Sequence, residues 1–558
     1  MSSVVSRHPF DEGLRRLRQF LSIRPEMTVE RLALYVAGFF TVFCNVAFFR
    51  AVAATGTLHG ASGWREALSL VLMVGALNVL LLLLLLNRWT LRPVLTLLIP
   101  ATAMAAHFMS RYTVYLDADM LRNILHTDGK ESGELISLGM LPSLLWLGVL
   151  PTLLVWRVRL KPRPIGRAVL VRLGCIVLSL AVAGGAMMAS FQDLSALMRN
   201  HKELRHLITP GNYIVSLVRV AQHDGARHAP KAPIGLNAHV VGRNPGARPR
   251  LLVIVVGETV RAQNWGLNGY ERQTTPQLRD IGPINFTDMT SCGSATEVSV
   301  PCMFSPFGRA HYDEDRIAHT QSLLNVLDHA GIGVLWRDNQ TGCKGVCEGL
   351  PFQSFEHAND PQACTAEGCL DEVMLHGLAD EIARRPGDQV IVLHQLGSHG
   401  PSYSKRYPAR LRRFTPTCET ADLGDCTREQ IVNAYDNSVL GTDDFLARTI
   451  RFLAEQSARD TAMIYLSDHG ESLGENGLYL HGVPYAIAPD TQRHLPMVMW
   501  FSPGFAADRN LDIDCMKRES HAPASQDNLF HSVLGLMQVE TPEYDRKLDL
   551  FDRCIAPG

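Results

Sequence analysis

The chain has 558 residues, of which 46% are apolar and 19% charged, with a formal net charge of −2 at pH 7. This composition is too apolar for a disordered chain and too polar for a purely membrane-embedded one, and without a basic excess it argues against nucleic-acid binding. The length exceeds that of one small domain. The averages also hide a split, because the first two-fifths of the chain is apolar and the rest resembles a soluble protein.

Five apolar stretches in the first 190 residues approach the length of about 20 residues that a helix needs to cross a bilayer. They cover residues 31–54, 66–87, 91–110, 134–156 and 168–190. Buried helices of a soluble protein are the alternative, but five such stretches in succession favour a membrane domain over residues 1–190. The first stretch is long and others follow it, which is unlike a cleavable signal peptide.

Basic residues indicate the orientation of these spans. Arg and Lys are concentrated before the first span, between the second and third, and between the fourth and fifth, whereas the segment between the third and fourth is more acidic. Because cytoplasmic loops are enriched in Lys and Arg, the N-terminus is predicted to be cytoplasmic. An odd number of spans then places the chain after residue 190 on the opposite side. Residues 111–132 would lie there too, as part of a lipid-entry groove or as an ordinary interfacial helix.

Ten of the twelve cysteines follow residue 290, and the other two, Cys44 and Cys175, lie within predicted spans. An even set of closely spaced cysteines in an exported domain predicts disulfides. The sequence alone does not fix their pairing. The most local arrangement pairs Cys292 with Cys302, Cys343 with Cys347, Cys364 with Cys369 and Cys418 with Cys426, which leaves Cys515 with Cys554.

The remainder of the chain divides into a linking region and a second domain. Residues 191–248 begin with an amphipathic stretch and continue as a Gly-, Pro- and Ala-rich segment typical of a linker. In residues 249–558, apolar runs alternate with helical patterns. The runs cover 251–256, 334–336, 390–394 and 462–467, and the helical patterns cover 318–330, 370–384 and 429–457. This alternation predicts an α/β domain with a mainly parallel sheet.

Polar residues directly after the apolar runs are the first candidates for a site, since ligands of parallel sheets bind at the carboxyl ends of the strands. Glu258 follows the first run, and Asp468 and His469 follow the last. Two carboxylates and one imidazole suit a divalent metal, and zinc accepts this set. For either carboxylate alone, capping of a helix is the alternative.

A hydroxyl-rich segment, residues 290–305, lies around Cys292 and Cys302. A hydroxyl at a helix start there could attack phosphorus, because a metal would lower its pKa and the helix N-terminus would accommodate a phosphate. The candidates are Ser294, Thr296 and Ser299. A simple helix-capping role is the alternative for each of them.

Two glycine-containing segments hold four histidines: His394 and His399 in the first, His469 and His481 in the second. Glycine lets the backbone approach a ligand closely. A lone histidine is usually structural, but three of these four are followed directly by Gly, which favours ligand roles.

The sequence closely resembles the phosphoethanolamine transferases of Gram-negative inner membranes over GETVRAQNWGLNGYERQTTP, TSCGSATEVSVPCMFS, WRDNQTGCKGVC, GSHGPSY and SDHGESLGENGLYLHGVPY. The branch that acts on lipid A, which includes the mobile colistin-resistance enzymes, is the most similar. The resemblance implies a periplasmic α/β domain of the alkaline-phosphatase/sulfatase type, preceded by a five-helix transmembrane domain in the inner membrane. We expect a monomer, although the sequence carries no sign of its association state.

The resemblance also implies roles for particular residues. In that family the threonine of the pattern C-G-x-x-T is the nucleophile, which here is Thr296. The implied ligands of one tightly bound zinc are Glu258, Thr296, Asp468 and His469. His399 and His481 match positions that hold phosphoethanolamine or a second zinc, and Lys344 matches a lysine close to the phosphate. Gln340 stands where some members have Asn.

The implied reaction moves phosphoethanolamine from phosphatidylethanolamine to a phosphate of lipid A through a phospho-threonine. The expected result is a less negative outer membrane and resistance to polymyxin and other cationic peptides. Transfer onto heptose or Kdo of the lipopolysaccharide core stays open, as does a related phosphodiesterase or glycerophosphotransferase. A sulfatase is disfavoured because its Cys/Ser-x-Pro-x-Arg modification site is missing from the expected place. An inactive scaffold is disfavoured because the nucleophile and metal positions are all present.

Overall fold

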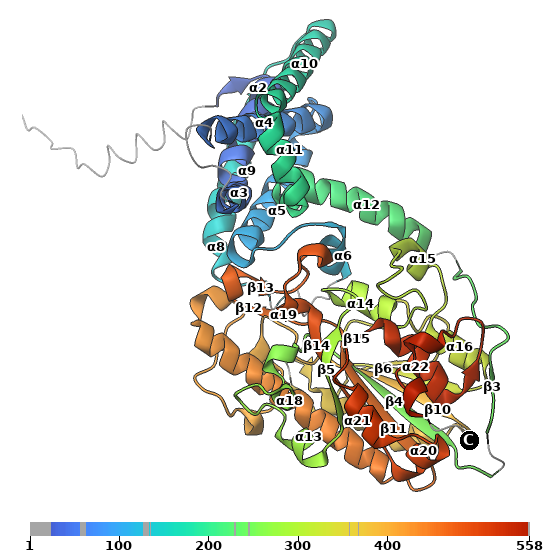
Figure 1. Cartoon of the computed structure of the whole chain (residues 1–558). Coiled ribbons are helices and arrows are strands. Elements are labelled where there is room, and N and C mark those ends of the chain that lie inside the picture. Colours follow the sequence, from blue (N-terminus) through green and yellow to red (C-terminus); the bar gives the residue numbers. More distant parts are fainter. Residues whose placement is uncertain are drawn as a thin grey trace, which may run out of the picture. The chain divides into compact units, whose positions relative to one another are not determined.

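The computed structural model describes residues 24–55, 63–126, 133, 135–227, 230–243, 246–355, 358–365 and 368–555. The chain forms two compact units. Unit 1 comprises Met1–Ser110 and Leu138–Ile214, and unit 2 comprises Arg111–Ser137 and Val215–Gly558 (Figure 1). The arginines up to residue 18, which enter the orientation argument, and residues 127–132 lie outside the described residues.

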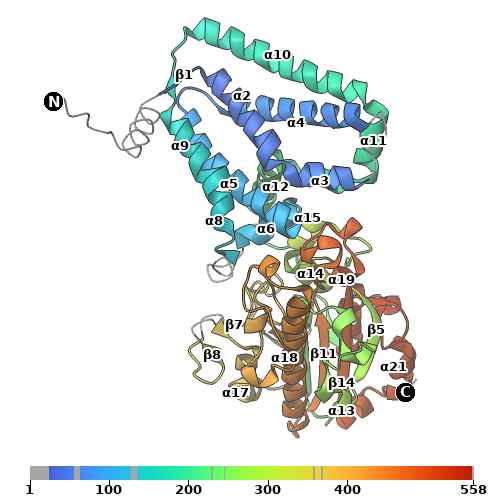
Figure 2. The same cartoon turned by 90° about the vertical axis from the view of Figure 1, so that its left-hand side faces the viewer.

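Unit 1 is helical and apolar on its outside. Its principal helices are α2 (Val29–Phe39), α3 (Val46–Ala54), α4 (Gly63–Leu85), α5 (Leu91–Tyr112), α8 (Met140–Ser143), α9 (Leu150–Arg157), α10 (Ile165–Ala189) and α11 (Phe191–Asn200) (Figure 2). The side chains of Leu97 and Leu170 are 75% and 71% exposed. Exposed apolar surface on this scale is typical of contact with lipid.

The predicted spans can be compared with these helices. Four helices within the described ranges are long and apolar enough to cross a bilayer: Gly63–Leu85, Leu91–Tyr112, Met140–Arg157 and Ile165–Ala189. Val29–Cys44 and Val46–Ala54 add a fifth span if they are taken together, since they pass the same test as a pair bent by 48°.

Unit 2 is built on an eight-stranded, mainly parallel sheet, as the sequence predicts. The strands in spatial order are β15 (Ala524–Ser525), β5 (Ile284–Thr290), β14 (His494–Phe501), β11 (Asp460–Ser467), β4 (Arg250–Gly257), β10 (Gln389–His394), β6 (Gly333–Asp338) and β7 (Phe352–Ser354). The strands from β11 to β7 are parallel, and β14 runs antiparallel to both of its neighbours. The four predicted apolar runs form β4, β6, β10 and β11.

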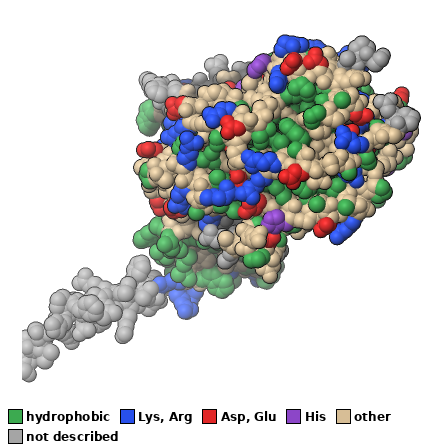
Figure 3. All heavy atoms as spheres, turned by 90° about the horizontal axis from the view of Figure 1, so that it is seen from below, with side chains coloured by type: hydrophobic (Ala, Val, Ile, Leu, Met, Phe, Trp, Pro, Cys, Tyr) green, Lys and Arg blue, Asp and Glu red, His purple; other side chains and the backbone are tan. Residues whose placement is uncertain are grey.

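Helices cover both faces of this sheet, which is why the middle residues of its central strands β4 and β11 are apolar and buried. On one face, Leu252, Ile254 and Val256 of β4 pack in one core with α14 (Thr296–Met303), α16 (Leu323–His329) and α22 (Asp527–Met537). On the other face, α18 (Arg428–Ala454) lies along β11 and beside α13 (Pro276–Ile281) (Figure 2). The outer face of unit 2 carries Lys and Arg interspersed with Asp and Glu (Figure 3), as expected for a water-exposed domain.

The remaining helices are shorter, and two helical patterns differ from their sequence predictions. These helices include α15 (Glu314–Ala318), α17 (Leu378–Ala383), α19 (Asp490–Arg493), α20 (Pro503–Asp508) and α21 (Ile513–Glu519). The pattern at 370–384 forms a 3-10 helix at Asp371–Leu375 and an α-helix only from Leu378, because Gly377 between them has a φ of +69°. The helical pattern at 318–330 begins as a helix only at Leu323. Ser322 stops it from starting earlier, because its side chain and that of Asn325 form a capping box at the helix start.

Residues 111–137 belong to unit 2, although they are far in sequence from the rest of it. Arg111 donates to Asp422 at 3.0 Å, and the hydroxyl of Thr113 donates to the Gly477 carbonyl at 3.2 Å. Helix α6 (Ala118–His126) packs against α14, and its Arg122, 1% exposed, forms an ion pair with Glu314 of α15. The segment between the predicted third and fourth spans is therefore part of unit 2.

Candidate active site

Glu258 and Asp468 lie side by side because their strands are neighbours. β11 pairs in parallel with β4 so that Ser467 is opposite Gly257, and the next residue of each strand carries a carboxylate. His469 follows Asp468, and all three side chains are fully buried. Their ligand atoms lie within 4.8 Å of one another. The structure therefore brings together three residues that the sequence places about 210 positions apart.

Thr296 joins this cluster from the first turn of α14. Its Oγ1 lies 3.1 Å from Glu258 Oε2 and 3.2 Å from His469 Nε2. The other two candidate hydroxyls lie elsewhere: Ser294 donates to the carbonyl of Val483 at 2.5 Å, and Ser299 is buried with no hydrogen-bond partner among the described residues. Thr296 is thus the candidate hydroxyl at the cluster.

Hydrogen bonds with backbone groups orient the side chains of Asp468 and His469. Asp468 Oδ1 accepts from the amides of Thr259 at 3.1 Å and His469 at 2.7 Å, whereas its Oδ2 accepts no hydrogen bond from the described residues. His469 Nδ1 lies 2.9 Å from the Gly470 carbonyl, so that Nδ1 donates and Nε2 faces the carboxylates. A buried carboxylate oxygen without a donor, beside another carboxylate and an imidazole nitrogen, fits a divalent metal ion.

The pKa values of the three side chains also favour a bound cation. Burial opposes ionisation of Glu258, but the hydrogen bond and charge of His469 outweigh it and lower the pKa of Glu258 well below its usual value. Burial, followed by the charge of Glu258, raises the pKa of Asp468 to about 6. Burial favours neutral His469, yet the charge of Asp468 and the contact with Glu258 raise its pKa to about 10. Two carboxylates thus hold a positive charge between them, which a metal cation can supply instead of the proton.

Two of the three other predicted histidines, His399 and His481, lie next to this cluster, whereas His394 Nδ1 lies 2.8 Å from Asp338 Oδ2. The ring of His481 is centred 4.3 Å from that of His469, and the ring of His399 is centred 5.7 Å from that of His481. His481 Nδ1 also lies 2.9 Å from Glu471, which is fully buried and accepts a hydrogen bond from Tyr403 at 2.7 Å. His469, Glu471 and His481 form a second group that could hold a metal.

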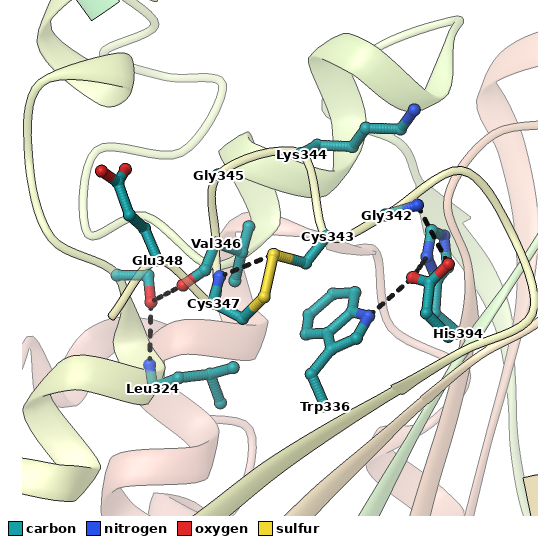
Figure 4. Close-up of a disulfide and its surroundings, with 12 residues drawn as sticks. Leu324, Trp336, Gly342, Cys343, Lys344, Gly345, Val346, Cys347, Glu348 and His394 are labelled. Atoms are coloured by element: carbon teal, nitrogen blue, oxygen red, sulfur yellow. Dashed lines mark hydrogen bonds and ion pairs between the residues drawn. A yellow bond between two sulfur atoms is a disulfide. The ribbon is translucent and has the colours of Figure 1, made fainter. Parts of the chain in front are cut away.

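Lys344 does not contact the cluster directly. It lies in a loop closed by the Cys343–Cys347 disulfide, and Figure 4 shows its side chain extending away from that bond. Its Nζ lies 2.9 Å from Glu297 Oε1 and donates to the Thr341 hydroxyl at 2.6 Å. The loop reaches the cluster through Gln340 instead, whose Nε2 donates to Glu258 Oε2 at 3.0 Å.

Disulfides hold several segments around the site. The structure pairs Cys292 with Cys302, Cys343 with Cys347, Cys364 with Cys369, Cys418 with Cys426 and Cys515 with Cys554. The first of these closes the loop that leads into α14 and hence positions Thr296. Cys44 and Cys175 are free thiols of unit 1.

Sequence reasoning missed two polar residues that support the cluster. Glu471 lies in the same motif as Asp468 and His469, and this proximity could have identified it. Gln526 carries no such signal. It is fully buried, its Nε2 donates to the carbonyls of Ser467 and Asp468 at 2.8 and 2.7 Å, and its Oε1 accepts from the Cys292 amide at 2.6 Å. It joins the end of β11 to the loop that leads to the nucleophile.

Two protein families match the chain. The family described as Sulfatase matches residues 250–539, and the family described as Phosphoethanolamine transferase EptA/EptB matches residues 73–224. Phosphoethanolamine transferase EptA of Escherichia coli strain K12 is 40% identical over 95% of this chain and 98% of its own length. The chain belongs to the EptA family of phosphoethanolamine transferases.

Two further relatives of this transferase are informative. Phosphatidylethanolamine transferase Mcr-1 of Escherichia coli is 41% identical over 83% of this chain and 88% of its own length. The solved structure of the integral membrane protein lipooligosaccharide phosphoethanolamine transferase A from Neisseria meningitidis matches with a TM-score of 0.92 at 36% identity, covering 96% of this chain and 100% of that one. The transferase described here is accordingly an inner-membrane protein with a periplasmic catalytic domain of the alkaline-phosphatase type.

Proposed function

We propose that this transferase moves phosphoethanolamine from phosphatidylethanolamine to a phosphate of lipid A, with Thr296 as the nucleophile. The observation that carries the proposal is the position of Thr296 Oγ1, 3.1 Å from Glu258 and 3.2 Å from His469. The Thr296 hydroxyl donates to the Glu258 carboxylate, which fixes the position of Oγ1 within the cluster. Mcr-1 bears the name of a phosphatidylethanolamine transferase, which supports the same donor for this chain.

The donor set supports zinc as the resident metal. Glu258, Asp468 and His469 would hold it together with Thr296 Oγ1, in agreement with the oxygen and nitrogen ligands that zinc accepts. When bound, zinc acts as a Lewis acid that lowers the pKa of the threonine hydroxyl and offsets the charge on phosphoryl oxygens. A second zinc near His399 and His481 belongs to the same proposal, and Glu471 would share in it.

The reaction then proceeds in two displacements. Thr296 Oγ1 forms a bond to the donor phosphorus while the bond to the diacylglycerol oxygen breaks, and the proton that Thr296 loses is balanced by the one that the departing oxygen takes up. Where no second zinc is bound, His481 is placed to give that proton, since Glu471 holds its Nδ1 at 2.9 Å and so orients the ring. In the second displacement a phosphate oxygen of lipid A attacks phosphorus, and the bond to Thr296 breaks. Lys344 contributes positive charge near the phosphoryl group.

The arrangement of the chain completes the proposal. The N-terminus lies in the cytoplasm and five spans cross the inner membrane, with the bent pair α2 and α3 as the first. The membrane part extends to residue 190, residues 191–248 link it to the catalytic part, and the enzyme works as a monomer. Anchoring suits a reaction in which donor and acceptor are both lipids. Each ethanolamine adds an ammonium beside a phosphate, so cationic peptides such as polymyxin bind the outer membrane less well.

Mass spectrometry of lipid A tests the nucleophile and the acceptor together. In a host without its own enzyme, the wild type and Ser294→Ala should add phosphoethanolamine to lipid A, and Thr296→Ala should not. Ser294→Ala is the matched control because it removes a neighbouring hydroxyl that points at Val483 instead. An adduct that survives in Thr296→Ala would refute the nucleophile. An adduct on core heptose or Kdo, with lipid A unmodified, would refute the acceptor.

A further inference from the structure

A buried ion pair lies directly beside the nucleophile. Glu297 follows Thr296 in α14, and its Oε1 is 2.9 Å from Lys344 Nζ. The two side chains are only 5% and 8% exposed. Removing two charges from water costs about as much as their attraction returns, so a buried pair is weak evidence for a stabilising role. This pair therefore calls for a functional explanation.

The loop that presents Lys344 is held in a fixed conformation. Lys344 has a φ of +51°, a region that side-chain-bearing residues rarely adopt, and the Cys343–Cys347 disulfide closes the loop around it (Figure 4). Its ammonium donates to the Thr341 hydroxyl at 2.6 Å, and that hydroxyl donates to Gln340 Oε1 at 2.6 Å. Since Gln340 also donates to Glu258, a hydrogen-bonded chain connects Lys344 to the metal cluster.

The ion pair lines a cavity of about 410 Å³. That volume is within the range of small-molecule sites. Glu314, Glu348 and Lys231 also line the cavity, so its wall carries charges of both signs. Apolar side chains, including Val298 and Phe304, form other parts of it. A cavity with this mixture fits a ligand that carries both charges itself.

We propose that this cavity receives the phosphoethanolamine group as a zwitterion, with its ammonium on Glu297 and its phosphoryl oxygens on Lys344. The inference deepens the proposed donor, on which it rests. When the group inserts between Glu297 and Lys344, each side chain exchanges one opposite charge for another, and no buried charge is left without a partner. Glu297 directly follows Thr296 in α14, and the hydrogen bonds from Lys344 through Thr341 and Gln340 reach Glu258, so a group held in this cavity lies next to the residue with which it reacts.

Glu297 is then the residue that selects ethanolamine over other headgroups. A glycerol headgroup offers a hydroxyl where ethanolamine offers an ammonium, and it would leave the Glu297 charge without a cation. Sites built for a charged group reject analogues that lack it, because the buried partner stays unpaired. The wild type should therefore discriminate against glycerol phosphates through binding alone.

Calorimetric titration of the full-length, metal-loaded protein in detergent tests this inference with two probes, O-phosphoethanolamine and glycerol 3-phosphate. The wild type should bind the first about tenfold more tightly, the size of one charge-assisted hydrogen bond. Glu297→Gln should reduce that ratio to about one. Lys344→Gln should weaken both probes alike, since both carry a phosphate. Glu381→Gln is the control, because it removes a carboxylate that also pairs with a cation, Arg384, outside the cavity.

Three outcomes would overturn the inference. One is a wild type without preference for O-phosphoethanolamine, which needs no variant to fold. Another is an equal loss of both probes in Glu297→Gln, which would mean that Glu297 only holds Lys344 in place. The third is a preference that survives in Glu297→Gln. An enzyme that transfers phosphoethanolamine but shows no preference for O-phosphoethanolamine would refute the inference and leave the proposed function standing. An enzyme that shows the preference but transfers no phosphoethanolamine would refute the proposed function.

Discussion

Gly397 is where a single methyl group should disable the candidate metal cluster by pressing on the backbone of one of its residues, Glu258. It follows β10 and has a φ of +52°. A Cβ built there would lie 2.7 Å from the carbonyl oxygen of Glu258, whereas ordinary contacts begin near 3.4 Å. In Gly397→Ala the two segments must separate by about 0.7 Å, and Ser398, whose amide donates to the same carbonyl at 3.0 Å, resists the separation.

The expected loss follows from that displacement. A misplacement of about 1 Å in a catalytic site costs about 100-fold in rate, so a shift of Glu258 by 0.7 Å should lower turnover by about 10- to 100-fold. Gly387→Ala is the matched control. Gly387 has a φ of +83° and nothing within 4 Å of a built Cβ, so it incurs the same backbone strain of about 1–2 kcal/mol without the collision.

Turnover of a fluorescent phosphatidylethanolamine, bound zinc and melting temperature would be measured for both variants. Gly397→Ala should lose turnover and zinc affinity, and Gly387→Ala should keep both. Backbone strain should lower the melting temperature of both variants, and the collision with Glu258 should lower that of Gly397→Ala further. Equal turnover in the two variants would refute the reasoning, because it would show that Gly397 is needed only for its positive φ and not for the close approach to Glu258.

Two further predictions concern stability. Burial raises the pKa of Asp443 from 3.8 to about 7. At pH values between these two, the folded state binds a proton that the unfolded state releases. The free energy of unfolding therefore falls as pH rises from about 4 to 7. Asp443→Asn keeps one of the two oxygens that accept from the amides of Gln277 and Leu278. The melting temperature of the variant should change less between pH 5 and 8 than that of the wild type, and the difference should amount to at most about 4 kcal/mol in the free energy of unfolding. Parallel wild-type and variant curves would contradict this. Gln526→Ala should lower the free energy of unfolding by about 2–4 kcal/mol, because it leaves three buried backbone groups without partners. The control Gln456→Ala removes a hydrogen bond to one carbonyl at a partly exposed site and should lower it by less than about 1 kcal/mol. Equal melting temperatures of the two variants would refute the role of Gln526.

The central strands and the metal cluster could be predicted because their signals are local. β4 and β11 have apolar centres, since both of their faces are covered, and Glu258 and Asp468 directly follow them. Parallel strands end at one edge of the sheet, so those carboxylates had to meet there. The choice of Thr296 over Ser294 and Ser299 came from a family pattern, and the structure places it at the cluster.

Features that depend on tertiary contacts could not be predicted. The antiparallel insertion of β14 between β5 and β11 is decided by long-range pairing, which leaves no local pattern. Gln526 looks like any helix-start polar residue until the fold brings Asp468 and Cys292 to it. Likewise, Glu297 stands out only once the loop with Lys344 is folded against α14.

Because residues 111–137 fold with the catalytic unit, a soluble fragment that begins after the last span is incomplete. Such a fragment keeps Glu258, Thr296, the Asp468–His469 pair and all five disulfides, yet it lacks α6 and both Arg111 and Arg122. Glu314 would lose Arg122, Asp422 would lose Arg111, and water would reach the α14 surface that α6 covers. Inhibitors selected on the fragment would be chosen partly for a surface that the whole enzyme hides, so screens need the intact chain.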